Sequence, residues 1–390
     1  MKRHCGKWML LVTLLVALLA MGGCGSGSNQ DLPPTRTPKP TFTTIPATPI
    51  VVDTPTPLWT ATPLPTATPT ATPSPIPTAT PNPYLNPLTG EMVADPAVLQ
   101  RRPLLVRIGN DYEVRPQSGL SLADMVWEEA MDGWTITRLT AVVWSRDPEV
   151  LKPIRSARLF TIDLGYMLDG ALVHSGANDQ VRWLLSQSTL VDLDEYFHSA
   201  PYSWLKPEGK WIDYPWMGRV ATSAKKVRDY LKKIGKEKAV QLPGFVFSEQ
   251  VPAGDAATYV EIPYPKRALV EYRYDAATHH YKRWARGEPH TDAVTGEQLA
   301  AANVIVVYAT YQETSVKDVN GQPTFNIVST GEGRAQIFRD GVVVEGKWIR
   351  PTREAFLQLV RLDGSPIPLR VGQSWMEVVP PDYHVTFKVE

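Results

Sequence analysis

Three loop segments in the first half of the chain carry residue types that can bind an anion. Arginine presents a planar fork of donors that fits carboxylate or phosphate, and a helix N-terminus adds free N–H groups. The sequence therefore predicts a cleft for an anionic or polar ligand where these loops meet. The candidate ligand-binding residues are Asn110, Arg115, Gln117, Arg138, Arg155, Ser156, Arg158, His174 and Ser175.

His174 is the residue that could add a reaction to binding, because histidine titrates near neutral pH and can transfer a proton. A hydrolase would use His174 as a general base, with Asp124 or Glu128 about 3 Å away, directly or through one water. The structural alternative is that His174 is a hydrogen-bonded core residue and that the arginines pair with carboxylates to hold the fold. The carboxylates expected for those pairs are Asp124, Glu128 and Asp163.

A second polar segment in the latter half of the chain contains His290 and Asp292, which are weak candidates for a metal site. No recognised ligand spacing accompanies them, so a polar turn before Gly296 is the favoured interpretation. No cofactor is expected, because the motifs HExxH, GxSxG and GxxxxGKS/T are absent. Both cysteines lie within the first 24 residues, which excludes a thiol nucleophile downstream.

The first half must position these loops, and its pattern predicts a mixed α/β arrangement. Asp132-Gly133 is a favoured hairpin dipeptide, and a helix starting at Ser121 is the competing interpretation. A short turn over 120–124 followed by the two strands would combine both. Strands and helices that alternate after it predict a βαβ crossover, and ligands bind at the carboxyl ends of strands in such sheets. The expected strands are 103–109, 125–131, 134–144 and 171–174, and the expected helices are 156–168 capped by Ser156, 178–187 capped by Asn178, and the basic segment 223–234.

The second half reads as mostly antiparallel β structure. Asp340-Gly341 between two apolar segments is the strongest hairpin signal in the chain. Short strands with regular turns predict a twisted antiparallel sheet or a small barrel. The expected strands are 268–274, 280–284, 303–311, 325–329, 334–339, 342–349, 356–362, 367–371 and 375–379.

The N-terminus has the organisation of a lipoprotein signal peptide over residues 1–23. Lys2, Arg3 and Lys7 precede an apolar run over 8–21, which is short for a membrane span, and Cys24 follows two glycines. We expect cleavage before Cys24 and lipidation of that cysteine at the extracytoplasmic face of a bacterial membrane. An ordinary secretory signal with an incidental cysteine is the alternative.

Residues 24–83 are predicted to be a disordered tether. Threonine and proline dominate 33–83, and proline fixes φ and removes a donor N–H, so neither helix nor sheet can form. The tether would be a spacer in extended polyproline II conformation, with O-glycosylation as a second possibility. The chain has 40 basic and 40 acidic residues, so no nucleic-acid partner is expected.

Several segments resemble the YerB-like bacterial lipoproteins, which are defined by domain of unknown function 3048. The resemblance covers residues 84–380 and implies an N-terminal domain over 84–250 and a C-terminal β-rich domain over 251–390, without an established activity. One difference is that Tyr214-Pro215-Trp216-Met217-Gly218-Arg219 stands where members of the family have a Pro-His-Asn element. The matching stretches are Asn86-Pro87-Leu88-Thr89-Gly90, Arg115-Pro116-Gln117-Ser118-Gly119-Leu120, Pro153-Ile154-Arg155-Ser156-Ala157-Arg158, His174-Ser175-Gly176, Pro289-His290-Thr291-Asp292 and Gly346-Lys347-Trp348.

Three functions follow from these observations. The leading hypothesis is a membrane-anchored binding protein whose arginine-rich cleft recognises a glycan, a peptide or another polar ligand of the cell envelope. The second is an envelope-polymer hydrolase that uses His174 and a carboxylate. The third is a structural module that docks another protein through its β domain.

Overall fold

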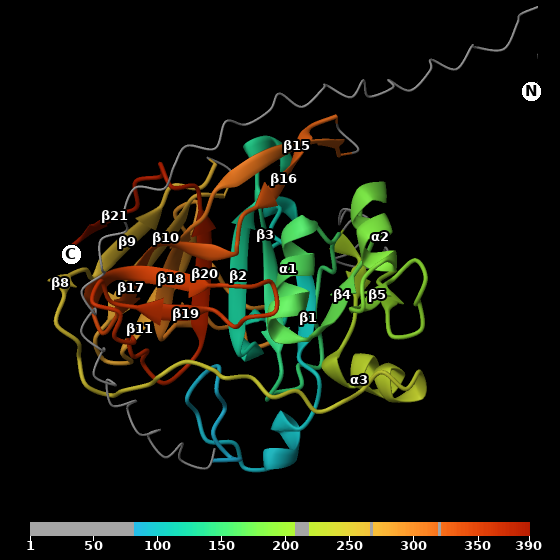
Figure 1. The fold of residues 1–390 in the computed structure, drawn as a ribbon, viewed down its shortest axis with the longest axis horizontal. Helices are drawn as coiled ribbons and strands as arrows, with labels where there is room; N and C mark the ends of the chain where they lie inside the picture. Colours follow the sequence, from blue (N-terminus) through green and yellow to red (C-terminus); the bar gives the residue numbers. More distant parts are fainter. Residues whose placement is uncertain (1–81, 207–217, 266–267, 319–320) are drawn as a thin grey trace, which may run out of the picture. The chain divides into compact units, whose positions relative to one another are not determined.

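The centre of the molecule is a sheet of 11 strands to which both halves of the chain contribute (Figure 1). The computed structural model describes residues 82–206, 218–265, 268–318 and 321–390. The path of the sheet is β19-β18-β17-β14-β20-β2-β3-β1-β4-β5, with β8 paired to β18. Its strands are β1 (Leu104–Gly109), β2 (Met125–Ala130), β3 (Thr137–Val143), β4 (Ala171–His174), β5 (Val191–Asp194), β8 (Asp255–Ala256), β14 (Asn303–Tyr308), β17 (Gly331–Arg339), β18 (Val342–Arg350), β19 (Gln358–Val360) and β20 (Ser374–Val379).

The strands of the first half largely confirm the sequence pattern. β2 and β3 form an antiparallel hairpin around Asp132–Trp134, where Gly133 adopts a φ of 73° that glycine tolerates without strain. The full helix from Ser121 is wrong, and the structure instead has the short turn followed by strands, with a 3-10 turn at Leu120–Leu122 before β2. β1 pairs antiparallel with β3 and parallel with β4, and β4 pairs parallel with β5.

A parallel pair of strands joins the two halves into one sheet. β2 runs beside β20 in register from Met125↔Ser374 to Glu129↔Val378, and β20 is also parallel to β14. In Figure 1 the green β2 therefore lies directly beside the red β20, although some 250 residues separate them in the chain. The second half is thus not purely antiparallel, and part of it completes a mixed sheet that begins in the first half.

A second sheet of six strands belongs entirely to the second half, and all its strand pairs are antiparallel. Two small additions complete the β structure, the hairpin β15–β16 and the pair β6–β7. The strands are β9 (Tyr259–Ile262), β10 (Val270–Asp275), β11 (His280–Ala285), β12 (Glu288–Pro289), β13 (Ala300–Ala301), β21 (Thr386–Lys388), β15 (Tyr311–Lys317), β16 (Pro323–Ile327), β6 (Ser203–Trp204) and β7 (Val220–Ala221). The predicted strand over 367–371 is wrong, because Leu369 makes only an isolated bridge to Phe247.

Helices are few: three α-helices, α1 (Leu159–Leu168), α2 (Asp179–Ser186) and α3 (Ala224–Lys233), lie in the described part of the chain. Asn178 caps α2, as expected, by accepting a hydrogen bond from a backbone N–H of the first turn. Ser223 caps α3 in the same way, which was not predicted from the sequence. Ser156 does not cap α1, which begins three residues later. No helix in the described ranges is long and apolar enough to cross a bilayer.

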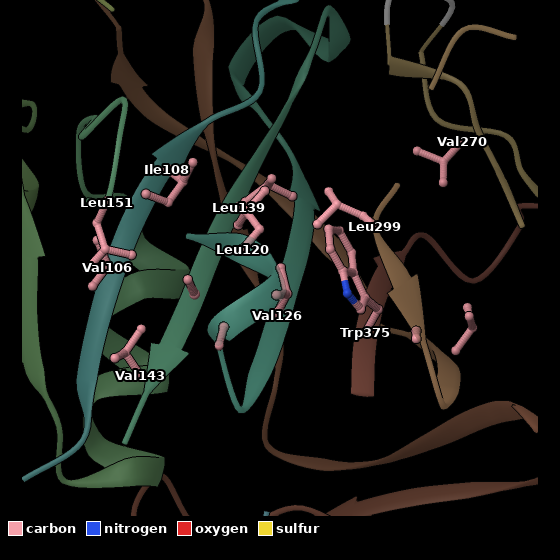
Figure 2. Close-up of a cluster of buried hydrophobic side chains, with 14 of the residues drawn as sticks. Val106, Ile108, Leu120, Val126, Leu139, Val143, Leu151, Val270, Leu299 and Trp375 are labelled. Carbon is pink, nitrogen blue, oxygen red and sulfur yellow. The ribbon is translucent and has the colours of Figure 1, made fainter. Parts of the chain in front are cut away.

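The large sheet separates two apolar clusters, because successive side chains of a strand point to opposite faces. Figure 2 shows one cluster, with Val106 and Ile108 of β1 and Leu139 of β3 on the side that also holds Val270 and Trp375. The other cluster contains Leu105 and Trp127 with the buried side chains of α1. The alternation decides which face each polar residue of β1, β2 and β3 occupies.

Replacing Leu139 by alanine should destabilise the protein strongly, because the side chain is fully buried in this cluster. A Leu→Ala change in a core costs about 2–5 kcal/mol in the free energy of unfolding. Leu362→Ala is the matched control, since Leu362 is 76% exposed and should change that free energy by less than about 0.5 kcal/mol. Urea unfolding of both variants measures the difference, and equal midpoints would contradict the placement of Leu139.

Candidate functional site

Four arginines gather at one end of the large sheet, on the face covered by α1. Arg107 lies on β1 and Arg138 on β3, and Arg155 and Arg158 lie in the segment that leads into α1. Backbone hydrogen bonds hold that segment against the sheet, from Arg155 N–H to the carbonyl of Arg107 and from Ser175 N–H to the carbonyl of Arg155. We call the four arginines and the three carboxylates near them the arginine cluster. Its members are Arg107, Arg138, Arg155, Arg158, Asp111, Glu129 and Asp132.

Two arginines of the cluster have close carboxylate partners. Arg107 Nη2 lies 2.6 Å from Glu129 Oε1, and both side chains are buried. Arg107 Nη1 also donates to the hydroxyl of Thr140 at 2.6 Å. Arg158 Nε donates to Asp132 Oδ2 at 2.6 Å. These pairs neutralise two of the four guanidinium groups.

The other two arginines share one carboxylate at longer distance. Arg138 and Arg155 lie 4.0 and 3.6 Å from Asp111 Oδ2. Arg138 is buried, and its Nε has no hydrogen-bond partner among the described residues. Burial lowers the pKa of Arg138 well below the usual arginine range, and the charge of Arg155 lowers it further. The Arg138 guanidinium is therefore the group of the cluster whose charge is least well balanced by the contacts of the described residues.

Arg155 and Arg158 connect this buried charge to solvent, since their side chains are 19% and 18% exposed. Ser156 lies between them, and its hydroxyl donates to the carbonyl of Ser175. An anion that reached this surface would meet the partly exposed guanidinium groups of Arg155 and Arg158. Such donors can form charge-assisted hydrogen bonds with carboxylate or phosphate oxygens.

The remaining predicted ligand-binding residues near the end of β1 lie on the opposite face of the sheet. Gln117 Nε2 and Arg115 Nη2 both donate to Asn110 Oδ1, at 2.9 and 3.0 Å. Asn110 Nδ2 donates in turn to Glu128 Oε1 and to the hydroxyl of Thr137. The structure therefore does not bring Asn110, Arg115 and Gln117 together with the arginine cluster in one cleft.

These residues join a buried polar network that extends into the second sheet. Arg283 of β11 lies 2.6 Å from Glu128 Oε2 and 3.2 Å from Glu377 Oε1. Arg283 Nε donates to His290 Nδ1, so the proton of that ring is on Nε2, which donates to Gln117 Oε1 at 2.7 Å. Burial lowers the pKa of His290 well below its usual value, with Arg283 acting in the same direction, and both keep the ring neutral.

The weak metal candidates have structural partners instead of a metal. His290 bonds to Arg283 and Gln117. Asp292 accepts hydrogen bonds from the N–H groups of Gly119 and Ser121 and from the Ser121 hydroxyl. Within the described ranges no group of three or more His, Cys, Asp or Glu side chains could hold a metal ion. Asp292 therefore fastens the turn before β2 to the second sheet.

His174 is buried and contacts a carboxylate, but not one of those expected from the sequence. Its Nε2 lies 2.6 Å from Asp192 Oδ1 of β5, and its Nδ1 lies 2.9 Å from the carbonyl oxygen of Gly176. Asp124 instead accepts hydrogen bonds from the Asn86 amide and the N–H of Trp144. Glu128 is held by Arg283. The proposed pair of His174 with Asp124 or Glu128 does not form, because each of the three has a different partner.

The arginine pairs expected as a structural alternative also differ in their partners. Arg158 binds Asp132, and Arg155 lies near Asp111, whereas Asp163 binds Arg353. Sequence reasoning missed Arg107 and Glu129, although a lone charge inside an apolar strand is an available signal, because such charges are seldom fully buried unless paired. Asp192, Arg283 and Glu377 were missed because their partners are distant in the chain. Residues 214–217 of the segment that differs from the family lie outside the described residues.

The buried pair of carboxylates should make stability depend on pH. Burial, and then the charge of neighbouring Glu128, raises the pKa of Glu377 to about 8 from 4.5. Between these two values the folded chain holds a proton that the unfolded chain loses, so stability should fall as pH rises from about 4.5 to about 8. Glu377→Gln should flatten this decline in urea unfolding measured across that range.

Glu332→Gln is the control, because Glu332 is exposed and makes only a surface ion pair with Lys347. It should leave the pH profile of unfolding unchanged. A wild-type profile that rises steadily through the same range, or a Glu377→Gln profile that equals it, would contradict a neutral Glu377.

Comparison with known proteins places the chain in a family. Two family models match, the N-terminal domain of a protein of unknown function (DUF3048) over residues 88–224 and its C-terminal domain over 260–376. A Bacillus subtilis (strain 168) protein named "Putative lipoprotein YerB" is 30% identical over 310 residues, which cover 75% of this chain and 86% of that protein. The crystal structure of YerB protein from Bacillus subtilis matches with a TM-score of 0.65 and 28% identity, covering 77% of this chain and 99% of that one. The chain belongs to the DUF3048 family, of which it carries both the N-terminal and the C-terminal domain.

Proposed function

We propose that this protein is a lipid-anchored binding protein on the extracytoplasmic face of a bacterial membrane, and that its arginine cluster binds an anionic group of a cell-envelope ligand. Residues 1–23 would be the signal peptide, Cys24 the lipidated residue and 24–83 the tether. The name of the Bacillus subtilis relative as a lipoprotein supports the anchor. Residues 84–250 and 251–390 would be the two domains, joined by the shared sheet.

The buried guanidinium of Arg138 is the observation that carries this proposal. Arg138 is buried without a hydrogen bond at Nε, and its nearest carboxylate is 4.0 Å away. Uncompensated buried charge is costly, and a bound anion would reduce that cost by supplying the missing acceptors. Arg155 gives such an anion access, because part of its side chain remains at the surface.

The hydrolase hypothesis has less support. The His174 ring is fully buried, and both of its nitrogens already contact acceptors. A general base must reach a substrate or its attacking water within hydrogen-bonding distance, which this position does not allow. Binding without a reaction is therefore the better account of this end of the sheet.

Arg155→Ala should abolish anion binding while leaving the fold intact. Inorganic phosphate is the simplest probe, and it should raise the melting temperature of the wild-type chain relative to chloride at equal ionic strength. At a concentration about 100 times the Kd, binding to the folded state alone would add about 2.7 kcal/mol to the free energy of unfolding. The alanine variant should lose this increment and keep its melting temperature in chloride.

Arg353→Ala is the matched control, because Arg353 is 44% exposed and pairs with Asp163 away from the cluster. It should retain the phosphate effect. The proposal is wrong if phosphate does not stabilise the wild-type chain more than chloride does. It is also wrong if Arg155→Ala unfolds at a much lower temperature in chloride, since the arginines would then be structural.

A further inference from the structure

A groove runs beside β5, the last strand of the large sheet, and nothing in the proposed function uses it. Its cavity of about 620 Å³ is bounded by α2, by β5 and the segment that follows it, and by the chain just after α3. The lining includes apolar, charged and hydrogen-bonding side chains. We call it the aromatic groove, and its principal residues are Arg182, Trp183, Asp192, Phe197, His198 and Lys236.

Large aromatic side chains stand exposed in and around this groove. Trp183 and Phe197 are 62% and 64% exposed. Tyr196, whose ring packs against that of Phe197, is 73% exposed, and Trp204, which bonds to Glu195, is 51% exposed. Most large apolar residues of the described chain are buried instead. Exposed apolar surface that is gathered in one place indicates a binding site, because it has a cost in water.

Three of the rings, those of Tyr196, Phe197 and Trp204, have polar neighbours that hold them. The guanidinium of Arg182 lies 5.5 Å from the centre of the Tyr196 ring and 5.9 Å from that of Phe197. The indole N–H of Trp204 donates to Glu195 Oε1 at 2.8 Å. Rings fixed in this way lose little conformational freedom when a ligand stacks on them.

The polar groups of the groove are also fixed from behind. His174 holds Asp192 through one carboxylate oxygen, and the Asp192 side chain remains 27% exposed, so its second oxygen can accept a ligand hydroxyl. His198 Nδ1 is bonded to the Tyr230 hydroxyl at 2.9 Å, which leaves its other nitrogen for a ligand. This gives buried His174 a role as a positioning residue for Asp192.

We propose that the aromatic groove binds a saccharide chain. A pyranose ring has an apolar C–H face that stacks on aromatic rings and a rim of hydroxyls that requires donors and acceptors held in fixed positions. The groove supplies both, with Trp183 and Phe197 as rings and Asp192, His198 and Arg182 as polar partners. An anionic membrane surface fits less well, because Asp192 and Glu195 place carboxylates among the rings.

This site is separate from the arginine cluster. The turn after β4 lies between them, with Ser175 bonded to Ser156 on the cluster side and Gly176 N–H bonded to Asp194 of β5 on the groove side. The two sites share no principal residue. A loss of phosphate binding at the arginine cluster therefore need not affect saccharide binding in the aromatic groove, and a loss of saccharide binding need not affect phosphate binding.

The test uses the purified mature chain and the tetramer of β1,4-linked N-acetylglucosamine, with saturation-transfer NMR and tryptophan fluorescence as readouts. The sugar should receive saturation from the wild-type protein and change its fluorescence. Trp183→Ala and Phe197→Ala should each weaken binding by about tenfold, which corresponds to about 1.4 kcal/mol. Both positions are exposed, so the variants should keep the wild-type melting temperature.

Tyr112→Ala is the matched control, since Tyr112 is an aromatic residue with 52% exposure outside the groove. It should bind the tetramer as the wild type does. Absence of saturation transfer to the sugar at millimolar concentration would overturn the proposal, and so would an equal loss in all three variants. Sedimentation of the wild type, but not of Trp183→Ala, with phosphatidylglycerol vesicles in the absence of sugar binding would assign the groove to the membrane instead.

Discussion

The buried contact of Arg283 with Glu128 and Glu377 is the interaction on which the rest of the structure depends. Glu128 and Glu377 are register partners on β2 and β20, the two strands that join the halves of the chain. Burial and the charge of Glu128 raise the pKa of Glu377 to about 8, so Glu377 holds a proton at neutral pH. Arg283, from the second sheet, pairs with Glu128 and lies 3.2 Å from Glu377 Oε1. The rings of Trp375 and Tyr272 enclose the guanidinium, with centres 4.4 and 5.2 Å away. Removing either Arg283 or Glu128 would leave the other charge buried without its partner, which costs about 3–5 kcal/mol.

This contact also fixes the polar residues at the end of β1. Glu128 accepts a hydrogen bond from Asn110, and Asn110 in turn accepts hydrogen bonds from Arg115 and Gln117. Gln117 also accepts one from His290, and His290 accepts one from Arg283, which closes the ring of hydrogen bonds. The polar side chains on this face of the sheet are therefore bonded to one another, and the arginine cluster lies on the opposite face. Asn110 and Asp111 are neighbours in the chain, yet Asn110 belongs to the hydrogen-bond network between the two sheets and Asp111 belongs to the arginine cluster.

The sequence predicted what is local and missed what is distant. The hairpins at Asp132-Gly133 and Asp340-Gly341 and the cap at Asn178 depend on neighbouring residues, and the structure contains all three. The pairing of β2 with β20 could not be predicted, because neither strand's pattern specifies a partner so far along the chain. The sequence also predicted that Arg115 and Arg155 lie in one cleft. They lie on opposite faces of the sheet, because the face that a loop side chain occupies depends on the path of the backbone. Asp192 could not be predicted as the partner of His174 either, because that pairing requires β4 and β5 to lie in register.

In each proposed site a neighbouring side chain holds the polar groups that a ligand would meet. In the groove His174 orients Asp192, and in the cluster Asp111 lies between Arg138 and Arg155. Both sites lie at the end of the sheet where β1 and β4 finish, and the turn after β4 contacts each of them. An envelope polymer with anionic groups along a saccharide backbone would satisfy both sites at once, the charge at Arg155 and a sugar ring at Trp183. In that case binding at one site would raise the local concentration of ligand at the other, and affinity would grow with chain length beyond that of either fragment.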